Sequence, residues 1–266
     1  MKLFYRKYGN GPPLFILHGL YGSSDNWVTV ARSISHKFTV YLPDQRNHGQ
    51  SPHSHLHDYN SMCQDLFELI EELKINKIFL AGHSMGGKVA VNFAMKWPEK
   101  INSLIIIDIS PFRPTDPENR FYNEHKHILE TILSVDLSKL KSRSEAESEF
   151  LRKIGSEKVT SFVLKNLQRT DDNTFSWKMN VKSLYNNLKT IVDSFPAPSL
   201  DGEPVTGFPV LFIKGENSDY LAKDELYTIR MLFPGAEMIT VENAGHWVHA
   251  ERPDAIGEIL LSQLTD

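Results

Sequence analysis

The segment Gly82-His83-Ser84-Met85-Gly86-Gly87 constrains the fold more than any other part of the chain. It follows the apolar run 77–81 and leads into a helical pattern over 88–97, so it predicts a tight turn from a strand into a helix. A serine at the tip of such a turn is pushed toward positive φ, where neighbouring Cβ atoms have no room. Glycines at positions 82 and 86 remove those atoms. The pattern therefore favours a serine that stands clear of a sheet, with a helix N-terminus directed at it.

Short aliphatic or β-branched runs alternate with helical patterns along the chain. Continuous apolar strands suit a parallel sheet that is covered on both faces, so the alternation predicts an α/β fold with a doubly wound, mostly parallel sheet. The predicted strands are 3–8, 14–17, 38–42, 77–81, 104–109, 210–213 and 238–241. The predicted helices between and after them are 27–35, 59–73, 86–97, 223–233 and 253–264.

The pattern changes between the strands 104–109 and 210–213, where no strong strand run occurs. Prolines mark both ends of this region, from Pro111 to Pro209, and helical periodicity within it predicts helices over 119–133, 145–154, 158–167 and 181–192. A structureless loop of this length is uncommon in a compact domain. We therefore expect a core formed by 1–110 and 207–266 and an inserted helical cap formed by 111–206, lying over the carboxyl ends of the strands.

Composition excludes several classes of function. The chain has 266 residues, 41% of them hydrophobic, so it can bury a large core. Its formal charge is −4, with no broad basic field to attract nucleic acid. No long apolar segment indicates a signal peptide or a membrane span, and the single cysteine, Cys63, excludes an intrachain disulfide. We expect a cytoplasmic protein, and the oligomeric state stays open.

A serine hydroxyl is a weak nucleophile and needs a base, which in turn needs an orienting acid. His246 follows the last predicted strand, on the same sheet edge as Ser84, and is the candidate base. A loop histidine with one structural hydrogen bond is the alternative. His249 lies nearby, toward the following helix, and is the weaker candidate.

Two positions compete for the acid. Asp108 ends an apolar strand, where an unpartnered carboxylate would be costly to bury, and His246 could partner it; the alternative is that Asp108 caps the entry to the cap through the following amides. The rival acid, Asp219, lies in the loop after the strand 210–213, where many relatives of such a fold carry their acid. In this chain Ser218 occupies the corresponding position. Asp219 and Glu216 could reach the base only if their loop shifts, so Asp108 ranks first.

An oxyanion formed at a substrate carbonyl needs preorganised amides. The candidates are the amide of Met85, next to the nucleophile, and the amide of Leu20, in a glycine-containing loop after the strand 14–17. The predicted substrate contacts are Tyr21, His83 and Trp247, each next in sequence to one of these predicted site residues.

The remaining polar loop and the other histidines are predicted to have structural rather than catalytic roles. The loop 44–51 is dense in polar groups, and we expect Asp44 and Arg46 to support it by hydrogen bonds rather than to contact substrate. His53, His55 and His57 alternate along a Ser/Pro-rich loop, and we expect them to be solvated rather than to bind metal. His125 and His127 are two positions apart on a predicted helix, so their side chains point in different directions. We expect no metal and no cofactor.

Together these motifs resemble the α/β-hydrolase superfamily over nearly the whole chain: His18-Gly19, the loop 44–51, the segment 82–87, and Gly245-His246-Trp247 followed by Glu251 and Pro253. Asp-x-Arg-Asn-His-Gly-x-Ser and Ile-Asp-Ile-Ser-Pro are similar to the small esterase and thioesterase branch, which has a helical cap and the triad acid after strand six. The resemblance implies the triad Ser84, His246 and Asp108.

The same resemblance implies a serine hydrolase that cleaves small-molecule carboxylic esters or acyl thioesters through an acyl-enzyme. A carbon-carbon bond hydrolase of the same fold, and a non-catalytic protein that binds a small ligand, are the alternatives.

Overall fold

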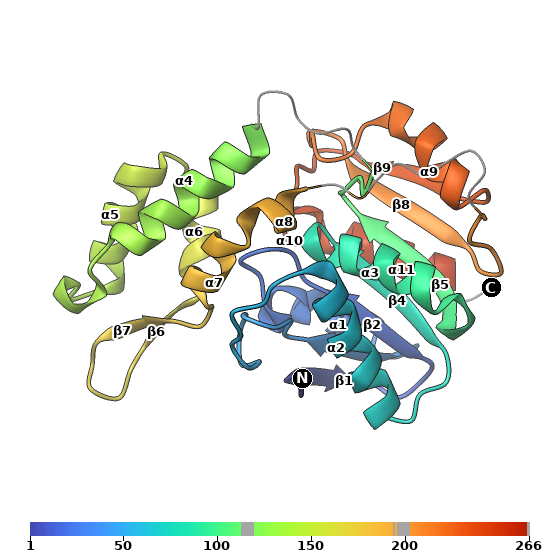
Figure 1. The fold of residues 1–266 in the computed structure, drawn as a ribbon, viewed down its shortest axis with the longest axis horizontal. Helices are drawn as coiled ribbons and strands as arrows, with labels where there is room; N and C mark the ends of the chain where they lie inside the picture. The colour runs from blue at the N-terminus through green and yellow to red at the C-terminus, as the bar shows by residue number, and fades with distance from the viewer. Residues whose placement is uncertain (113–119, 194, 196–202, 265–266) are drawn as a thin grey trace.

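The structure is a computed structural model that describes residues 1–112, 120–193, 195 and 203–264. Within these ranges the core is a seven-stranded sheet in the order β1-β3-β2-β4-β5-β8-β9 (Figure 1). Strand β1 pairs antiparallel with β3, and the other neighbours are parallel. The strands are β1 (Tyr5–Tyr8), β2 (Pro13–Leu17), β3 (Thr39–Pro43), β4 (Ile78–His83), β5 (Ile101–Ile107), β8 (Val210–Gly215) and β9 (Glu237–Val241). The predicted α/β fold with a mostly parallel sheet is confirmed.

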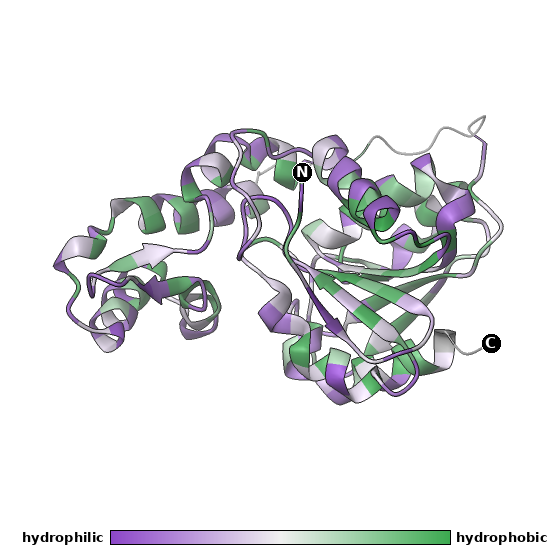
Figure 2. Cartoon of the chain, turned by 90° about the horizontal axis from the view of Figure 1, so that it is seen from below, coloured by the Kyte–Doolittle hydropathy of each residue, from purple (hydrophilic) through white to green (hydrophobic). Residues whose placement is uncertain are grey.

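Helices cover both faces of the sheet, and Figure 2 shows hydrophobic strands lying between two helical layers. Side chains alternate between the two faces: in β2, Phe15 and Leu17 join one hydrophobic cluster while Leu14 and Ile16 join the other. The first cluster includes α2 (Tyr59–Glu72), α3 (Met85–Lys96) and α9 (Leu226–Leu232); the second includes α1 (Val28–Ile34), α10 (Val248–Glu251) and α11 (Pro253–Leu264). Burial on both faces explains why the strands are apolar throughout.

Helix α3 packs closely on the strands because small residues face the sheet. Gly86, Ala90 and Ala94 are spaced four apart and buried. A Cβ added at Gly86 would lie 2.5 Å from the carbonyl oxygen of Leu17, so the helix approaches β2 more closely than a side chain permits. The helix ends at Lys96, before Pro98 opens a short 3-10 turn (Pro98–Lys100).

The segment between β5 and β8 is mainly helical, as expected, and lies to one side of the sheet in Figure 1. It contains α4 (Arg120–Ser134), α5 (Arg143–Ile154), α6 (Glu157–Leu164), α7 (Val181–Asn186) and α8 (Leu188–Val192). Asn119, the first residue of one predicted helix, lies outside the described residues. The predicted helix 158–167 ends early, at Leu164: residues 165–166 form a turn and Leu167 begins a β-hairpin of β6 (Leu167–Arg169) and β7 (Phe175–Trp177), closed by a turn with Asn173 at φ 66°. The limits of the cap, 111–206, stay a prediction.

Two polar side chains of the core, Lys88 and Tyr59, hold the end of this segment by hydrogen bonds. The Lys88 ammonium of α3 is buried and donates to the carbonyls of Ile191, Val192 and Asp193, at 3.3, 2.9 and 2.9 Å. Burial lowers the pKa of Lys88 to about 8. The Tyr59 hydroxyl donates to Ile191 as well, at 2.5 Å. The carboxyl end of α8 is therefore attached to the helix that follows Ser84.

Candidate active site

Ser84 lies between β4 and α3 in the strained conformation that the glycine pattern predicts. Its φ is 53° and its ψ is −120°. A Cβ added at Gly82 would lie 2.3 Å from the carbonyl oxygen of Gly86, so the turn excludes larger residues there. The amide of Ser84 donates to the carbonyl of Ile107 at 3.0 Å, which ties the turn to the neighbouring strand β5. Strain is retained at such a residue because the surrounding structure fixes it.

Ser84, His246 and Asp108 form one hydrogen-bonded chain. The Ser84 Oγ lies 3.1 Å from Nε2 of His246, and Nδ1 of His246 lies 2.8 Å from Oδ2 of Asp108. These residues come from the carboxyl ends of β4, β9 and β5, which lie at one edge of the sheet because the strands are parallel. If Nδ1 carries the proton that it donates to Asp108, Nε2 is free to accept the serine proton.

Asp108 is fully buried and is held by more than the histidine. It has φ 50° and follows β5 directly, whereas the sequence pattern predicts a strand that continues to Ile109. The amide of Gly215 donates to its Oδ1 at 2.8 Å, and the Ser218 hydroxyl donates to its Oδ2. Hydrogen bonds of this kind offset the cost of burying a carboxylate. The sequence does not predict this hydrogen bond from Ser218, although Ser218 occupies the position where related folds carry their acid.

The rival Asp219 lies away from this chain. Its side chain is 71% exposed, and its Oδ2 is 3.2 Å from Nη2 of Arg120. Glu216 is also directed elsewhere, since its Oε2 accepts from the amide of Asn243 at 2.8 Å. The geometry therefore brings Asp108, and not Asp219, to His246.

The two candidate oxyanion residues flank the serine. Leu20 follows Gly19, where an added Cβ would lie 3.1 Å from Cβ of Ser84, so this loop passes directly beside Ser84. Met85 is the first residue of α3. Nδ1 of His57 accepts a hydrogen bond from Nδ2 of Asn47 at 3.2 Å, so Nε2 carries the ring proton and donates a hydrogen bond to the Met85 sulfur at 3.4 Å.

The three predicted substrate contacts have different surroundings. Tyr21 is buried, with φ 61°, and its hydroxyl lies 3.3 Å from the carbonyl oxygen of His125. Trp247 is half-buried, with its ring centroid 5.0 Å from that of Phe162 in α6. His83 is 2% exposed, and its Nε2 donates to the carbonyl of His246 at 2.7 Å. His83 thus holds the backbone of the candidate base from inside the core.

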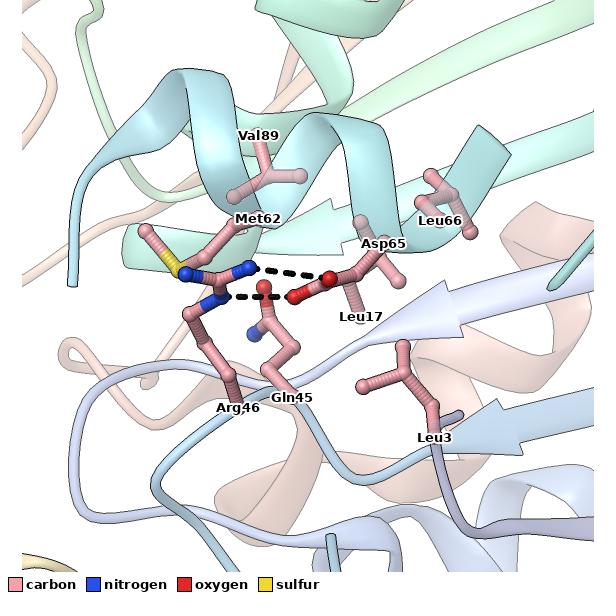
Figure 3. A pocket seen from close by; sticks show the side chains of 8 residues that line it. All are labelled: Leu3, Leu17, Gln45, Arg46, Met62, Asp65, Leu66 and Val89. Atoms are coloured by element: carbon pink, nitrogen blue, oxygen red, sulfur yellow. Dashed lines mark hydrogen bonds and ion pairs between the residues drawn. The ribbon is translucent and has the colours of Figure 1, made fainter. Parts of the chain in front are cut away.

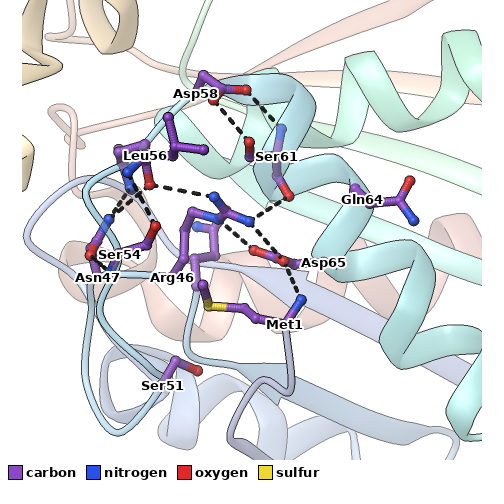
Figure 4. Close-up of polar contacts among 12 residues, drawn as sticks. Met1, Arg46, Asn47, Ser51, Ser54, Leu56, Asp58, Ser61, Gln64 and Asp65 are labelled. Atoms are coloured by element: carbon purple, nitrogen blue, oxygen red, sulfur yellow. Dashed lines mark hydrogen bonds and ion pairs between the residues drawn. The ribbon is translucent and has the colours of Figure 1, made fainter.

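The polar loop 44–51 has the hydrogen bonds of a structural element. Asp44 accepts from the amides of Ser24 and Gln50, at 2.6 and 2.8 Å. Arg46 forms a buried, two-bond ion pair with Asp65, Nε to Oδ2 at 2.6 Å and Nη2 to Oδ1 at 2.9 Å (Figure 4). Figure 3 shows the pocket beside this pair, lined by Leu3, Leu17, Gln45, Arg46, Met62, Asp65, Leu66 and Val89, and no member of the Ser84 chain lines it.

The expectation that the loop histidines are solvated is correct for His53 and His55 and wrong for His57. His57 is fully buried, and burial lowers its pKa well below the ordinary value, so it stays neutral. The periodicity of the loop could not show this, because His57 packs against Met85 from the distant elbow. No group of three or more His, Cys, Asp or Glu side chains that could hold a metal ion occurs in the described part of the chain.

Comparison with known proteins decides the family. A family model described as alpha/beta hydrolase fold matches residues 12–253. The chain belongs to this family. The Escherichia coli protein Esterase YbfF is 32% identical over 97% of this chain and 94% of its own length. The Danio rerio protein sn-1-specific diacylglycerol lipase ABHD11 is 37% identical over 95% of this chain and 78% of its own length.

A solved structure of this family, a marine microorganism esterase, superposes on the chain with a TM-score of 0.91 at 40% identity and covers 99% of both chains. The recognition of the α/β-hydrolase family is therefore confirmed, and so is the prediction of a serine hydrolase that cleaves esters. Within the described residues, no helix has the length and apolar character needed to cross a membrane.

Proposed function

We propose that the ester is cleaved by Ser84 as nucleophile, His246 as general base and Asp108 as the orienting acid. The observation that carries this assignment is the hydrogen-bond chain from Ser84 Oγ through His246 to Asp108, with links of 3.1 and 2.8 Å. Oγ attacks the acyl carbonyl while its proton passes to Nε2, and the imidazolium then gives that proton to the leaving group. Water, activated by the same imidazole, releases the acid from the acyl-enzyme.

The amides of Leu20 and Met85 are the proposed donors to the oxyanion. Support comes from the close approach of the Gly19 loop to Ser84 and from the position of Met85 at the N-terminus of α3. Removing one donor of this kind typically costs about 3 kcal/mol of transition-state stabilisation. The neutral imidazole of His57 holds the Met85 side chain and so restricts the start of the helix.

Tyr21 and Trp247 remain proposed substrate contacts, whereas His83 is better assigned to positioning the base. The buried ring of His83 donates to the backbone of His246, and burial lowers its pKa well below the ordinary value, so it stays neutral. A small-molecule acyl ester or thioester is the proposed substrate, no nucleic acid partner is expected, and a cytoplasmic location stays a prediction from the single Cys63.

Replacing Ser84 with Ala tests the nucleophile. We expect cleavage of p-nitrophenyl esters and labelling by a fluorophosphonate to be lost together in Ser84→Ala. The matched control is Ser262→Ala, an exposed serine on α11, which should behave as the wild type. Wild-type rates in Ser84→Ala would refute the assignment. A wild type that cleaves dienoic diketones but not esters would instead support a carbon-carbon bond hydrolase, and a panel of acyl-CoA and p-nitrophenyl esters separates thioester from ester preference.

A further inference from the structure

A tyrosine ring lies against the imidazole of His246. The centroids of Tyr220 and His246 are 3.7 Å apart, and the two planes are inclined by 20°. Tyr220 is half-buried and follows the segment that carries Ser218, which holds Asp108. One loop after β8 therefore contacts both the acid and the base of the site.

The position of Tyr220 is fixed from several sides. Its amide donates to Oγ of Ser218 at 3.2 Å, and its carbonyl accepts from the amide of Ser110 at 3.0 Å. Its hydroxyl lies 3.3 Å from Nε2 of His125 in α4, and its ring centroid lies 4.4 Å from that of Phe121 in the same helix. Backbone contacts from the core and side chains from α4 thus hold the ring in place.

The hydrogen bonds of His125 define the direction of the contact with Tyr220. The Tyr21 hydroxyl donates to the His125 carbonyl at 3.3 Å, so its oxygen can accept from Nδ1 of His125, also at 3.3 Å. Nε2 of His125 then accepts a hydrogen bond from the Tyr220 hydroxyl. Burial, together with the nearby His246, lowers the pKa of His125 to about 4, so this imidazole is neutral near pH 7.

We propose that Tyr220 is a positioning residue whose ring face stabilises the imidazolium that His246 becomes during each turnover. This inference rests on the proposed role of His246 as general base. When Nε2 of His246 takes the proton of Ser84, the ring becomes a cation, and the negative face of an aromatic ring attracts a cation within about 6 Å. The contact is stronger in the charged state than in the neutral state, so it favours the transition state over the resting enzyme.

The titratable groups around His246 do not obscure a change in the pKa of its imidazole. Asp108 faces Nδ1 and is the anionic partner. His83 and His249 approach from the core and His125 from α4, and burial lowers the pKa of each of them, to about 3 for His249 and about 4 for His125. His249 and His125 stay neutral above about pH 5, and burial shifts the pKa of His83 in the same direction, so a movement of the acid limb reports on His246 itself.

The experiment compares Tyr220→Leu, Tyr220→Phe and Tyr227→Leu by the pH profile of kcat/KM for a p-nitrophenyl ester. Tyr220→Leu removes the aromatic face, and Tyr220→Phe keeps it without the hydroxyl. Tyr227→Leu is the matched control, because it makes the same substitution at a tyrosine of α9 that is 75% exposed. In Tyr220→Leu the imidazolium loses a stabilising contact, so we expect the acid limb to move to lower pH by about 0.5 to 1 unit. The plateau should fall by about 3- to 10-fold.

Tyr220→Phe and Tyr227→Leu should keep the limb where it is in the wild type. Thermal unfolding of each variant establishes that the folded protein is being assayed, and a Tyr220→Leu variant that does not fold leaves Tyr220→Ile and Tyr220→Met for the same measurement. A fall in the plateau with an unmoved acid limb would mean that Tyr220 only packs, and it would overturn the proposal, as would a limb that moves equally in Tyr220→Phe. A wild type without esterase activity would contradict the proposed function instead.

Discussion

Replacing Asp108 with Asn tests which carboxylate orients His246. Asp108 accepts from Gly215, Ser218 and His246, and it is fully buried, so no water can substitute for a lost partner. An asparagine whose Oδ1 stays on the Gly215 amide turns its NH₂ group toward Nδ1 of His246. That donor forces the imidazole proton onto Nε2, where it blocks transfer from the serine. A wrong tautomer of this kind lowers kcat by about 10³- to 10⁴-fold.

Asp219→Asn is the matched control, because its side chain is 71% exposed and pairs with Arg120 rather than with the base. We expect its kcat for p-nitrophenyl acetate to stay within about two-fold of the wild type. Circular dichroism and thermal unfolding establish that both variants fold, and fluorophosphonate labelling reports on the same serine without turnover. Equal losses in the two variants, or a fast Asp108→Asn enzyme, would refute the assignment of the acid.

Three further predictions concern stability. Burial lowers the pKa of His18 from 6.5 to about 4, so between these pH values the unfolded chain binds more protons than the folded protein. The free energy of unfolding should therefore fall as pH falls through this window, by up to about 3 kcal/mol from this residue. Equal midpoints in urea titrations at pH 7 and pH 4.5 would contradict this prediction. Gly86→Ala places a Cβ 2.5 Å from a strand carbonyl and should lower the melting temperature by several degrees, whereas Gly235→Ala meets no atom within 4 Å and should not. Arg46→Met removes the guanidinium from the buried Asp65, which keeps the N-terminal ammonium of Met1 at 2.6 Å, so the loss in urea unfolding should stay below the about 3–5 kcal/mol of a fully unpaired buried charge; recovery in the double variant with Asp65→Asn checks that the carboxylate charge is the cause.

The sequence located the candidate site because parallel strands end at one edge of their sheet. Ser84 and His246 each follow a predicted strand and Asp108 lies at the end of one, so topology alone brought the three together without any knowledge of side-chain packing. The steric demand of the elbow was readable as well, since only glycines fit beside a residue at positive φ.

Contacts between distant loops could not be read in the same way. The hydroxyl of Ser218 and the ring of Tyr220 reach the site only because β8 lies beside β5 and the loop after it turns back. His57 is buried although its neighbours His53 and His55 are exposed, because the fold, and not local polarity, places it against Met85. The hairpin of β6 and β7 was missed since its strands are too short to give a periodic signal.

The proposed acid, Asp108, lies where the loops after two neighbouring strands meet. Ile107 pairs with Ile213 in register, so the chain leaves β5 and β8 side by side, and the Oδ2 of Asp108 meets both His246 and the residue at 218. A carboxylate introduced at 218 with a serine at 108 would therefore approach the same imidazole from the neighbouring strand. The proposed acid thus has two positions from which a carboxylate could reach His246, whereas the close backbone contacts of Gly82 and Gly86 restrict the proposed nucleophile, Ser84, to one.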